Sequence, residues 1–548
     1  MSGGWRIALA QVDPLVGDVE GNLERVREAV LRGRDSGARL VVLPEMVLSG
    51  YPPEDLLFHS GLRRRIDRAL AALPELADGV GFVVGFPEYD GDKIWNAAAV
   101  FDGGREVARY RKWLLPNYAV FDEKRYFETG DAACTFEIEG TTVGLTVCED
   151  VWQPGPAAAS AAAGAELILT INGSPYAVGA QARREGVVAD RVRETGVPLV
   201  YVNMVGGQDE LVFDGGSFAM APDGETRVRG PAFEESIVSV NVQRDADGRI
   251  DIAAGDVAPL QEPCESVYAA LVQGTRDYVR KNGFPGIILG LSGGIDSALT
   301  LAVAVDALGA DAVRAVMMPY RYTADMSRED AALQAAAMGV DYDVVSIEPM
   351  VEAAMGQLAP MFGDLARDTT EENIQSRCRC IVLMALSNKT GRMLLTTGNK
   401  SEMAVGYATL YGDMAGGYAP IKDCPKTLVY ELARYRNSLT PEVPPIPERV
   451  ITRPPSAELA PDQKDEDSLP PYEVLDPILE AFMERDLSVA EIAALGFDRD
   501  TVVEVLTMVR RNEYKRRQAP PGVRISSRAF GRDWRYPITS GYRFPAGD

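Results

Sequence analysis

Short apolar runs alternate with amphipathic stretches through the first half of the chain. Residues 22–33 repeat their apolar positions at helical spacing and predict a helix. The runs that predict strands are 6–12, 40–43, 82–85, 97–101, 143–147, 167–171, 199–202 and 236–242. Because strands and helices that alternate pack as layers, this pattern predicts an α/β layered domain that ends near residue 251.

The alternation restarts after a stretch that contains glycine and proline but few hydrophobic residues. A helix is predicted over 266–282, then a strand over 287–289, a glycine-rich turn and a helix over 298–308. Further strands are predicted at 313–318, 344–347 and 393–396. This order is typical of a doubly wound, Rossmann-like parallel sheet, which binds ligands at the carboxyl ends of its strands. The expected organisation is a domain over 1–252, a linker over 253–265 and a domain over 266–548.

Two segments have unusual composition. Residues 157–163 are rich in alanine and are interpreted as a packed helix. Residues 441–471 are rich in proline and charge, which by itself is typical of a linker or a disordered segment.

Composition limits the class of protein. The 548 residues are 46% hydrophobic and 25% charged, as in an ordinary soluble globular protein. The formal net charge of −24 argues against a nucleic-acid-binding surface, because neutralising phosphates needs a basic face. The sequence shows neither an apolar run of membrane-spanning length nor a signal segment. We therefore expect a cytoplasmic protein with no nucleic-acid or membrane partner.

Cysteine and histidine usage excludes several chemistries. The six cysteines show no CxxC spacing, which argues against a zinc site and against disulfides, and Cys378 and Cys380 are predicted to be buried thiols. The single histidine, His59, excludes a Ser-His-Asp triad, a Cys-His pair and two-histidine metal motifs. We expect His59 itself to be packed rather than catalytic.

The glycine-rich turn of the second half is the strongest motif. It comprises Gly290, Leu291, Ser292, Gly293, Gly294, Ile295, Asp296 and Ser297. A strand, a glycine turn and a helix N-terminus direct unpaired backbone N–H groups and the helix dipole at one point, where an anion is stabilised. No Gly-Lys pair is present, so this is not a Walker A loop, and Asp296 offers a carboxylate for Mg²⁺. The residues resemble the SGGxDS loop of the ATP pyrophosphatases, which bind the β,γ-pyrophosphate of ATP.

Three patches in the first half together form an amide-cleaving set. A cysteine attacks an amide carbon as a thiolate and needs a base beside it, and in a chain without a suitable histidine a glutamate can serve. Glu45 is assigned as base, Lys112 as oxyanion stabiliser and Cys148 as nucleophile. The order Glu, Lys, Cys resembles the nitrilase superfamily and implies an αββα sandwich. Glu128 is either an accessory acid or part of a surface ion pair.

Two neighbouring stretches, 117–127 and 172–176, resemble the glutaminase domain of glutamine-dependent NAD synthetases. This resemblance implies that Tyr118, Glu149 and Ser174 hold the glutamine. Members of the family usually carry a basic residue six positions after that serine, but this chain has Ala180. A basic residue at 180 is predicted to tighten glutamine binding, unless the nearby Gln181, Arg183 or Arg184 makes that contact.

The second half contributes further candidate residues at 372–377, 396–402 and 412–423. Asp296 and Glu402 are expected to share Mg²⁺, and Lys400 and Lys422 to offset charge on phosphates. These motifs are similar to those of NAD synthetases. The resemblance implies that Asn373, Glu402 and Lys515 contact deamido-NAD, and that residues 290–297 with Thr397 contact ATP. It also makes 453–459 and 463–467 a loop that covers the substrate. The basic residues at 510–517 are either a solvated helix face or a site for the dinucleotide pyrophosphate.

The resemblance implies an ATP-dependent ligase that amidates deamido-NAD to NAD with ammonia from L-glutamine, through an adenylated intermediate, in the last step of NAD biosynthesis. It also implies a homo-oligomer, a dimer at least and possibly an octamer. Two alternatives are a different glutamine-fed ATP pyrophosphatase, similar to GMP synthetase, and a tRNA-binding module of the pyrophosphatase fold with a degenerate nitrilase scaffold. The single histidine argues against the first, and the acidic charge with an intact Glu45, Lys112 and Cys148 argues against the second.

Overall fold

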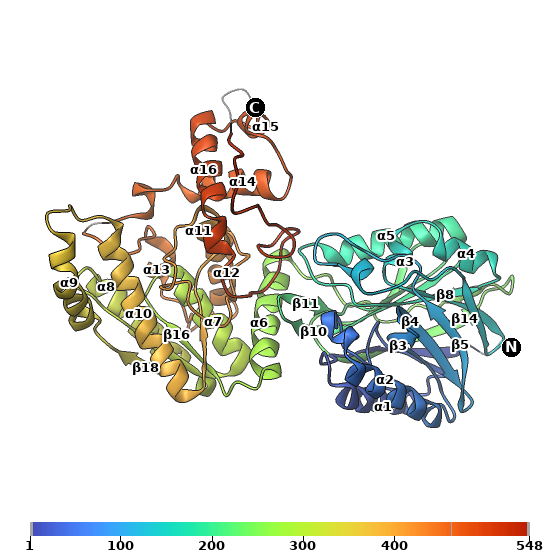
Figure 1. Ribbon diagram of the computed structural model, residues 1–548. Helices are drawn as coiled ribbons and strands as arrows, with labels where there is room; N and C mark the ends of the chain where they lie inside the picture. The colour runs from blue at the N-terminus through green and yellow to red at the C-terminus, as the bar shows by residue number, and fades with distance from the viewer. Residues whose placement is uncertain (1–3, 462, 545–548) are drawn as a thin grey trace. The chain divides into compact units, whose positions relative to one another are not determined.

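The chain is divided into two units, 1–261 and 262–548. The computed structural model describes residues 4–461 and 463–544. In Figure 1 the first unit runs from blue to green and the second from green to red. The division falls within the predicted linker, and the chain ends of the predicted domains (1–3 and 545–548) lie outside the described residues.

Two sheets form the first unit. In spatial order the seven-stranded sheet contains β15 (Ile250–Ile252), β14 (Ser236–Arg244), β1 (Trp5–Gln11), β2 (Leu40–Val42), β3 (Gly81–Asp90), β4 (Lys93–Asp102) and β5 (Arg105–Arg111). The six-stranded sheet contains β13 (Thr226–Arg229), β12 (Phe218–Met220), β9 (Leu199–Asn203), β8 (Leu167–Asn172), β7 (Thr141–Val147) and β6 (Cys134–Ile138). A separate hairpin joins β10 (Val205–Gln208) and β11 (Leu211–Asp214).

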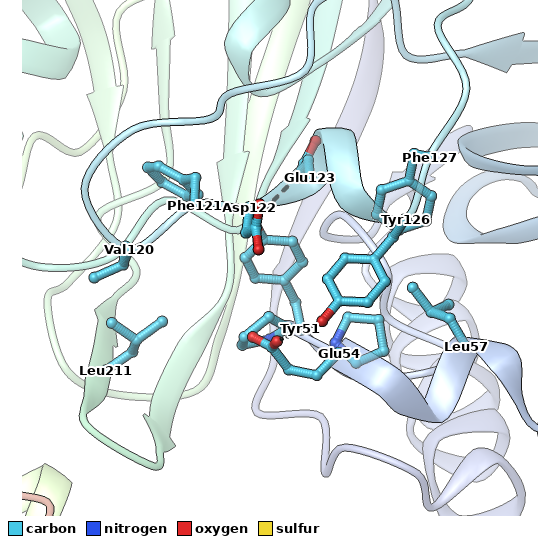
Figure 2. Close-up of a pocket in the computed structure, with 12 residues that line it drawn as sticks. Tyr51, Glu54, Leu57, Val120, Phe121, Asp122, Glu123, Tyr126, Phe127 and Leu211 are labelled. Atoms are coloured by element: carbon cyan, nitrogen blue, oxygen red, sulfur yellow. Dashed lines mark hydrogen bonds between the residues drawn. The ribbon is translucent and has the colours of Figure 1, made fainter. Parts of the chain in front are cut away.

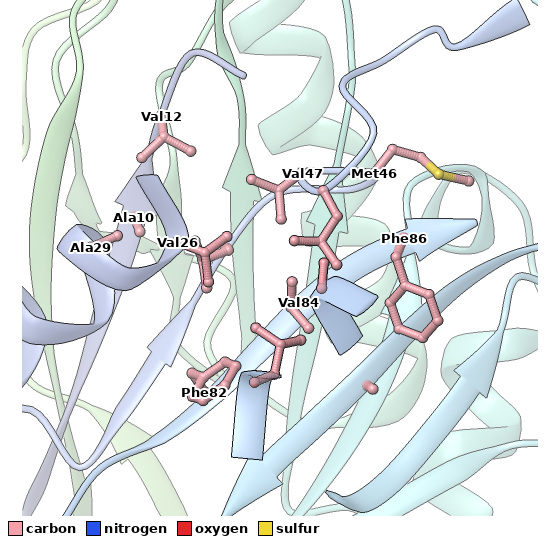
Figure 3. Packing of buried hydrophobic residues seen from close by; sticks show 14 of the residues in the cluster. Ala10, Val12, Val26, Ala29, Met46, Val47, Phe82, Val84 and Phe86 are labelled. Atoms are coloured by element: carbon pink, nitrogen blue, oxygen red, sulfur yellow. The ribbon is translucent and has the colours of Figure 1, made fainter. Parts of the chain in front are cut away.

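The two sheets pack face to face between two layers of helix. One core cluster combines Leu9 and Val83 of the first sheet with Leu145 and Leu169 of the second. The helices of this unit are α1 (Val19–Asp35), α2 (Ser60–Ala72), α3 (Glu149–Trp152), α4 (Pro156–Ala162) and α5 (Ala180–Thr195). Helices α1 and α2 bury their apolar faces on the first sheet, and α4 and α5 on the second. Figure 3 shows Val26 of α1 close to residues of β1 and β3. The predicted αββα sandwich and the packed helix at 157–163 are confirmed.

A four-stranded parallel sheet organises the second unit. Its spatial order is β18 (Asp341–Val344), β17 (Val313–Met317), β16 (Ile287–Gly290) and β19 (Met393–Leu395). The chain proceeds from β16 to β17 and β18 on one side and places β19 on the other, so the order reverses between β16 and β19. Ligands bind at such a reversal, beyond the carboxyl ends of the strands. The predicted doubly wound fold is confirmed.

Helices cover this sheet and extend beyond it. They are α6 (Pro263–Lys281), α7 (Ile295–Leu308), α8 (Asp325–Met338), α9 (Glu348–Phe362), α10 (Thr369–Thr390), α11 (Lys400–Val405), α12 (Lys426–Ser438), α13 (Glu448–Thr452), α14 (Tyr472–Met483), α15 (Val489–Ala494), α16 (Arg499–Arg511) and α17 (Glu513–Arg516). Helices α11, α14, α15 and α16 share a separate core with the C-terminal segment around Trp534. Across the described ranges, no helix is both long and apolar enough to span a membrane.

The structure corrects several predicted elements. The third strand of the second unit lies at 341–344 rather than 344–347, because it pairs with β17 and ends where β17 ends. This edge strand is polar, so the apolar residues after it drew the prediction too far along the chain. Strand β15 follows the predicted last strand of the first unit, and β5, β6 and β10–β13 were not predicted. His59 is exposed at the start of α2, so its predicted packed position is wrong.

Candidate active sites

Two buried side chains form the centre of the first site. Glu45 follows β2 and Lys112 follows β5, and neither has measurable exposure to solvent. Lys112 Nζ donates to Glu45 Oε1 at 2.8 Å. The second Glu45 oxygen accepts from the Gly173 backbone N–H at 2.7 Å. The loops that follow β2 and β5, two strands of the same sheet with β3 and β4 between them, thus bring together two residues that lie 67 positions apart in sequence.

Cys148 stands at a strained turn directly after β7. Its backbone has φ 46° and ψ −100°, a conformation that a residue with a Cβ rarely adopts and that costs of order 1–3 kcal/mol. A sharp strand-to-helix turn of this kind presents a nucleophile at the edge of a sheet. Burial, together with repulsion from Glu45, raises the pKa of the Cys148 thiol well above its ordinary value, and Lys112 opposes this shift. The thiol is therefore protonated at neutral pH, and its attack requires a base.

A second glutamate, Glu123, completes the centre. Lys112 Nζ also donates to Glu123 Oε1 at 2.9 Å, and the Tyr51 hydroxyl donates to the same oxygen at 3.0 Å. Burial raises the pKa of Glu123 to about 7, with Lys112 lowering it and Glu45 raising it. Figure 2 shows the small pocket that Tyr51 and Glu123 line beside Val120.

Glu123, and not Glu128, is the second carboxylate beside Lys112. Glu128, for which the sequence left open an accessory acid or a surface ion pair, is exposed, which favours the surface position. Glu123 lies within the stretch 117–127 that carries the family resemblance, but no spacing rule distinguishes it from its neighbours. Burial by itself would lower the pKa of Lys112. The carboxylates of Glu123 and Glu45 outweigh this effect and hold the pKa well above its ordinary value, so Lys112 stays charged.

The residues predicted to hold the substrate glutamine are Tyr118, Glu149 and Ser174. They lie near this centre and form hydrogen bonds with one another or with buried groups. The Tyr118 hydroxyl donates to Glu149 Oε2 at 2.9 Å, and Tyr118 is half-exposed. Burial raises the pKa of Glu149, whereas the bond from Tyr118 lowers it. Ser174 is buried, and its backbone N–H donates to Asn203 Oδ1 at 2.9 Å.

Arg184 is the basic residue that reaches Ser174. Its Nε donates to Ser174 Oγ at 3.2 Å, and its Nη2 donates to the Ser174 carbonyl oxygen at 3.0 Å. An ion pair with Asp214 at 2.7 Å holds the buried guanidinium in place. Arg183 is exposed, and Ala180 is buried in the first turn of α5. Of the three polar neighbours named from the sequence, Arg184 therefore contacts the serine directly.

The second site is a cavity of about 610 Å³ at the carboxyl ends of β16 and β19. The predicted ATP residues that line it are Gly290, Leu291, Ser292, Gly294, Ile295, Asp296, Ser297 and Thr397. Gly293 has φ +80°, and a Cβ there would lie 2.3 Å from the Ser327 carbonyl oxygen, so only glycine fits. Helix α7 begins within this turn and directs its N-terminus at the cavity.

Asp296 and Glu402 share a cation that the sequence did not indicate. The ammonium of Lys426, at the start of α12, pairs with both carboxylates and lies 2.9 Å from Glu402 Oε1. Burial raises the pKa of Glu402 to about 8, with Lys426 lowering it and Asp296 raising it. Lys426 stands three residues beyond the motif 412–423, where no pattern marks it as special.

The two lysines predicted to offset phosphate charge, Lys422 and Lys400, lie in different surroundings. Lys422 lines the cavity. Lys400 is buried among side chains of the protein, with its Nζ 2.9 Å from Asp423 and 3.1 Å from Glu484. Its charge is already neutralised there, so the prediction that Lys400 offsets phosphate charge is wrong. Lys426 also lines the cavity, where it pairs with Asp296 and Glu402.

Asn373 and Lys515 support the wall of the cavity. Asn373 Oδ1 accepts from the Thr409 hydroxyl at 2.9 Å, and Lys515 Nζ donates to the carbonyl oxygens of Gly406 and Ala408 at 2.7 and 2.8 Å. Both residues thereby hold the segment 406–409, part of which lines the cavity. Of the basic cluster near the C-terminus, Arg516 and Arg517 pair with Glu513.

The proline-rich segment is part of the site rather than a linker. Within 441–471, of which residue 462 lies outside the described residues, residues 453–459 and 463–465 line the cavity. Arg453 donates to Ser327 Oγ at 2.9 Å, and Ser327 in turn donates to Glu458 Oε1. Cys380 also lines the cavity and is half-buried, so only Cys378 of the predicted thiol pair is fully buried.

The two sites define an amidase unit joined to an ATP-using synthase unit. Residues 6–249 match the family model of carbon–nitrogen hydrolases, and residues 267–519 match that of NAD synthases. The glutamine-dependent NAD(+) synthetase of Acinetobacter baylyi is 49% identical over 542 residues, which cover 98% of this chain and 99% of the relative. That of Xylella fastidiosa is 49% identical over 99% of this chain and 100% of the relative.

A solved structure agrees with both matches. The glutamine-dependent NAD(+) synthetase of Acinetobacter baumannii in complex with ADP has a TM-score of 0.80 at 46% identity and covers 99% of this chain and 100% of that chain. This chain therefore belongs to the glutamine-dependent NAD(+) synthetases. The alternatives of a GMP-synthetase-like enzyme and of a tRNA-binding module are wrong.

Proposed function

We infer that the two units perform the two halves of one reaction. The enzyme is a ligase that amidates deamido-NAD to NAD, with ATP as energy source and L-glutamine as nitrogen donor. The observation that carries this inference is the buried Glu45–Lys112 pair beside Cys148, in the same chain as a pyrophosphate-loop cavity. The first site has the groups to cleave glutamine and the second has the loop to bind ATP, so the reaction needs both.

In the first half-reaction, Cys148 attacks the carboxamide carbon of glutamine. Glu45 accepts the thiol proton and delivers it to the leaving ammonia, and Lys112 stabilises the oxyanion with its ammonium. Water then hydrolyses the thioester to glutamate, with Glu45 again as base. Tyr118, Glu149 and Ser174 hold the glutamine, and Arg184 positions Ser174.

In the second half-reaction, the nicotinate carboxylate oxygen attacks the α-phosphorus of ATP. The bond from that phosphorus to the bridging oxygen breaks, and pyrophosphate leaves toward the loop 290–297. Ammonia attacks the adenylated carboxyl carbon and gives up one proton, and the C–O bond to AMP breaks, which releases AMP and yields NAD. Thr397 contacts ATP, Asn373, Glu402 and Lys515 position deamido-NAD, and Lys422 offsets phosphate charge.

We propose that Asp296 and Glu402, which pair with Lys426 in this structure, would hold Mg²⁺ together with the phosphates of ATP. Within the described ranges, no cluster of three His, Cys, Asp or Glu side chains is arranged to hold a metal. Mg²⁺ is often held by one or two carboxylates together with substrate phosphates, so a pair of acids beside the pyrophosphate loop suffices. Bound there, the ion would neutralise charge on the phosphates of ATP.

We also propose that the chain forms at least a dimer. Helices α9 and α10 leave Ile381 58% exposed and Met361 78% exposed, and Leu365 between them is 78% exposed. We infer that another copy of the chain covers these exposed apolar side chains. Sedimentation is expected to show a dimer or a larger oligomer, and a stable, active monomer would refute this.

Isotope transfer tests the whole reaction. Incubation with amide-¹⁵N-glutamine, ATP and deamido-NAD is expected to give ¹⁵N-labelled NAD together with AMP, pyrophosphate and glutamate. Formation of ADP and phosphate in place of AMP and pyrophosphate would contradict the proposed adenylate. NAD without the label would contradict the transfer of ammonia from glutamine.

A further inference from the structure

One cation of the second cavity has no acidic partner. Arg379 of α10 lines the cavity, and its Nε donates to the Met318 carbonyl oxygen at 3.1 Å. Among residues 4–461 and 463–544, no carboxylate lies within ion-pair distance of its guanidinium. By contrast, Lys426 pairs with two carboxylates.

The acids nearest to Arg379 are already engaged. Asp413 accepts from the Thr409 backbone N–H at 2.7 Å, and Glu458 accepts from the Ala324 backbone N–H at 3.2 Å. Burial lowers the pKa of Arg379, and these two acids oppose that shift only from beyond ion-pair distance. The guanidinium still remains charged at any working pH. Arg379 is half-buried, and a partly desolvated charge without an ion-pair partner is unfavourable, so an anion that enters the cavity would stabilise this arrangement.

The position of Arg379 indicates which anion. Leu383, one helical turn further on the same face of α10, lies 3.4 Å from where a Cβ of Gly290 would be, and the Met318 side chain lies 3.2 Å from that point. Arg379 is thus anchored at the end of β17, next to the first residue of the pyrophosphate loop. Strands β16, which ends at Gly290, and β17 both end at the edge of the sheet where this fold binds nucleotides.

We propose that Arg379 binds the α-phosphate of ATP and of the adenylated intermediate. This rests on the proposed function, in which the loop 290–297 takes the β- and γ-phosphates. The α-phosphate is the remaining phosphate and the one on which charge develops. A planar fork of N–H donors matches two oxygens of a phosphate, which a lysine cannot do.

Arg379 would act in both chemical steps. When the carboxylate oxygen attacks the α-phosphorus and pyrophosphate leaves, the non-bridging oxygens of the α-phosphate remain paired with the guanidinium. When ammonia attacks the acyl carbon, the C–O bond breaks and its electron pair stays on the phosphate of AMP. The same guanidinium stabilises that gain of negative charge.

Binding of AMP and of adenosine by the full-length protein tests this assignment, because only AMP carries the phosphate. For Arg379→Gln we expect the preference for AMP over adenosine to fall roughly ten- to a hundredfold, about 1.4–2.8 kcal/mol, with adenosine affinity unchanged. Arg379→Lys should retain part of the preference, since it keeps the charge but loses the fork. Arg321→Gln, which removes an exposed arginine paired with Glu348, is the matched control.

Two results would overturn the proposal: an unchanged AMP preference in Arg379→Gln, or an equal loss of AMP and adenosine binding. The second result would mean that Arg379 only supports the cavity wall. Ammonia-driven NAD synthesis by the wild type is measured alongside. If the wild type makes no NAD, the proposed function fails; if it does and Arg379→Gln keeps its AMP preference, only the role of Arg379 fails.

Discussion

Replacement of Cys148 separates the two half-reactions. The Cys148→Ala variant lacks the thiol that lies beside Glu45 and Lys112, and nothing in the second cavity depends on this thiol. We expect glutamine-driven NAD synthesis to fall by at least about 10⁴-fold, the scale on which removal of a catalytic nucleophile acts. Synthesis from ammonium at mildly alkaline pH, where more free ammonia is present, should continue at the wild-type rate.

The strained backbone of Cys148 adds a quantitative expectation. With φ 46° and ψ −100°, any residue with a Cβ carries strain of order 1–3 kcal/mol, which alanine keeps and glycine relieves. Glycine also makes the unfolded chain more flexible, which costs roughly 0.4–1 kcal/mol. Cys148→Gly should therefore be about 1 kcal/mol more stable than Cys148→Ala, and equally inactive with glutamine.

The assays are NAD formation with glutamine or ammonium and thermal unfolding of both variants. Cys134→Ala, at a half-buried cysteine of the same unit, is the control and should keep both activities. Glutamine-driven synthesis that survives in Cys148→Ala would refute the assignment of the nucleophile. A glycine variant clearly less stable than the alanine variant would refute the claim of strain.

Three further predictions follow from the sites. Burial raises the pKa of Glu123 to about 7 from an ordinary 4.5. A carboxyl whose pKa is raised in the folded state adds to the free energy of unfolding below about pH 4, and this contribution is lost as the pH rises through 7. The melting temperature of the wild type minus that of Glu123→Gln should therefore fall between pH 5 and pH 8, and a rise would contradict the shift. Asp296→Asn and Glu402→Gln should abolish NAD formation but leave glutamate release detectable; normal NAD synthesis at low Mg²⁺ would refute their role. Ala180→Lys should not lower KM for glutamine, because Arg184 already holds the site and a buried cation at a helix N-terminus is unfavourable; a lower KM would restore the expectation from sequence.

Local sequence was sufficient for features that local physics controls. The pyrophosphate turn at 290–297 needs glycines and a following helix within a few residues, and this requirement is visible in the chain. Glu45 and Cys148 each follow a predicted strand and Lys112 lies in an aromatic-flanked stretch, so the chemistry of the three was visible in the sequence, and the structure joins Glu45 and Lys112 in one ion pair. The alternation of strands and helices likewise predicted both layered units.

Tertiary packing decided which polar residues act together. Lys400 and Lys426 look alike in sequence, but Lys400 is enclosed by Asp423 and Glu484, whereas Lys426 lies between Asp296 and Glu402. Glu123 and Arg184 acquire their partners only when distant segments fold together, because charge pairing depends on distance in space. Position along the chain identifies a residue's neighbours only within about one helical turn or one strand, and beyond that range the fold assigns them.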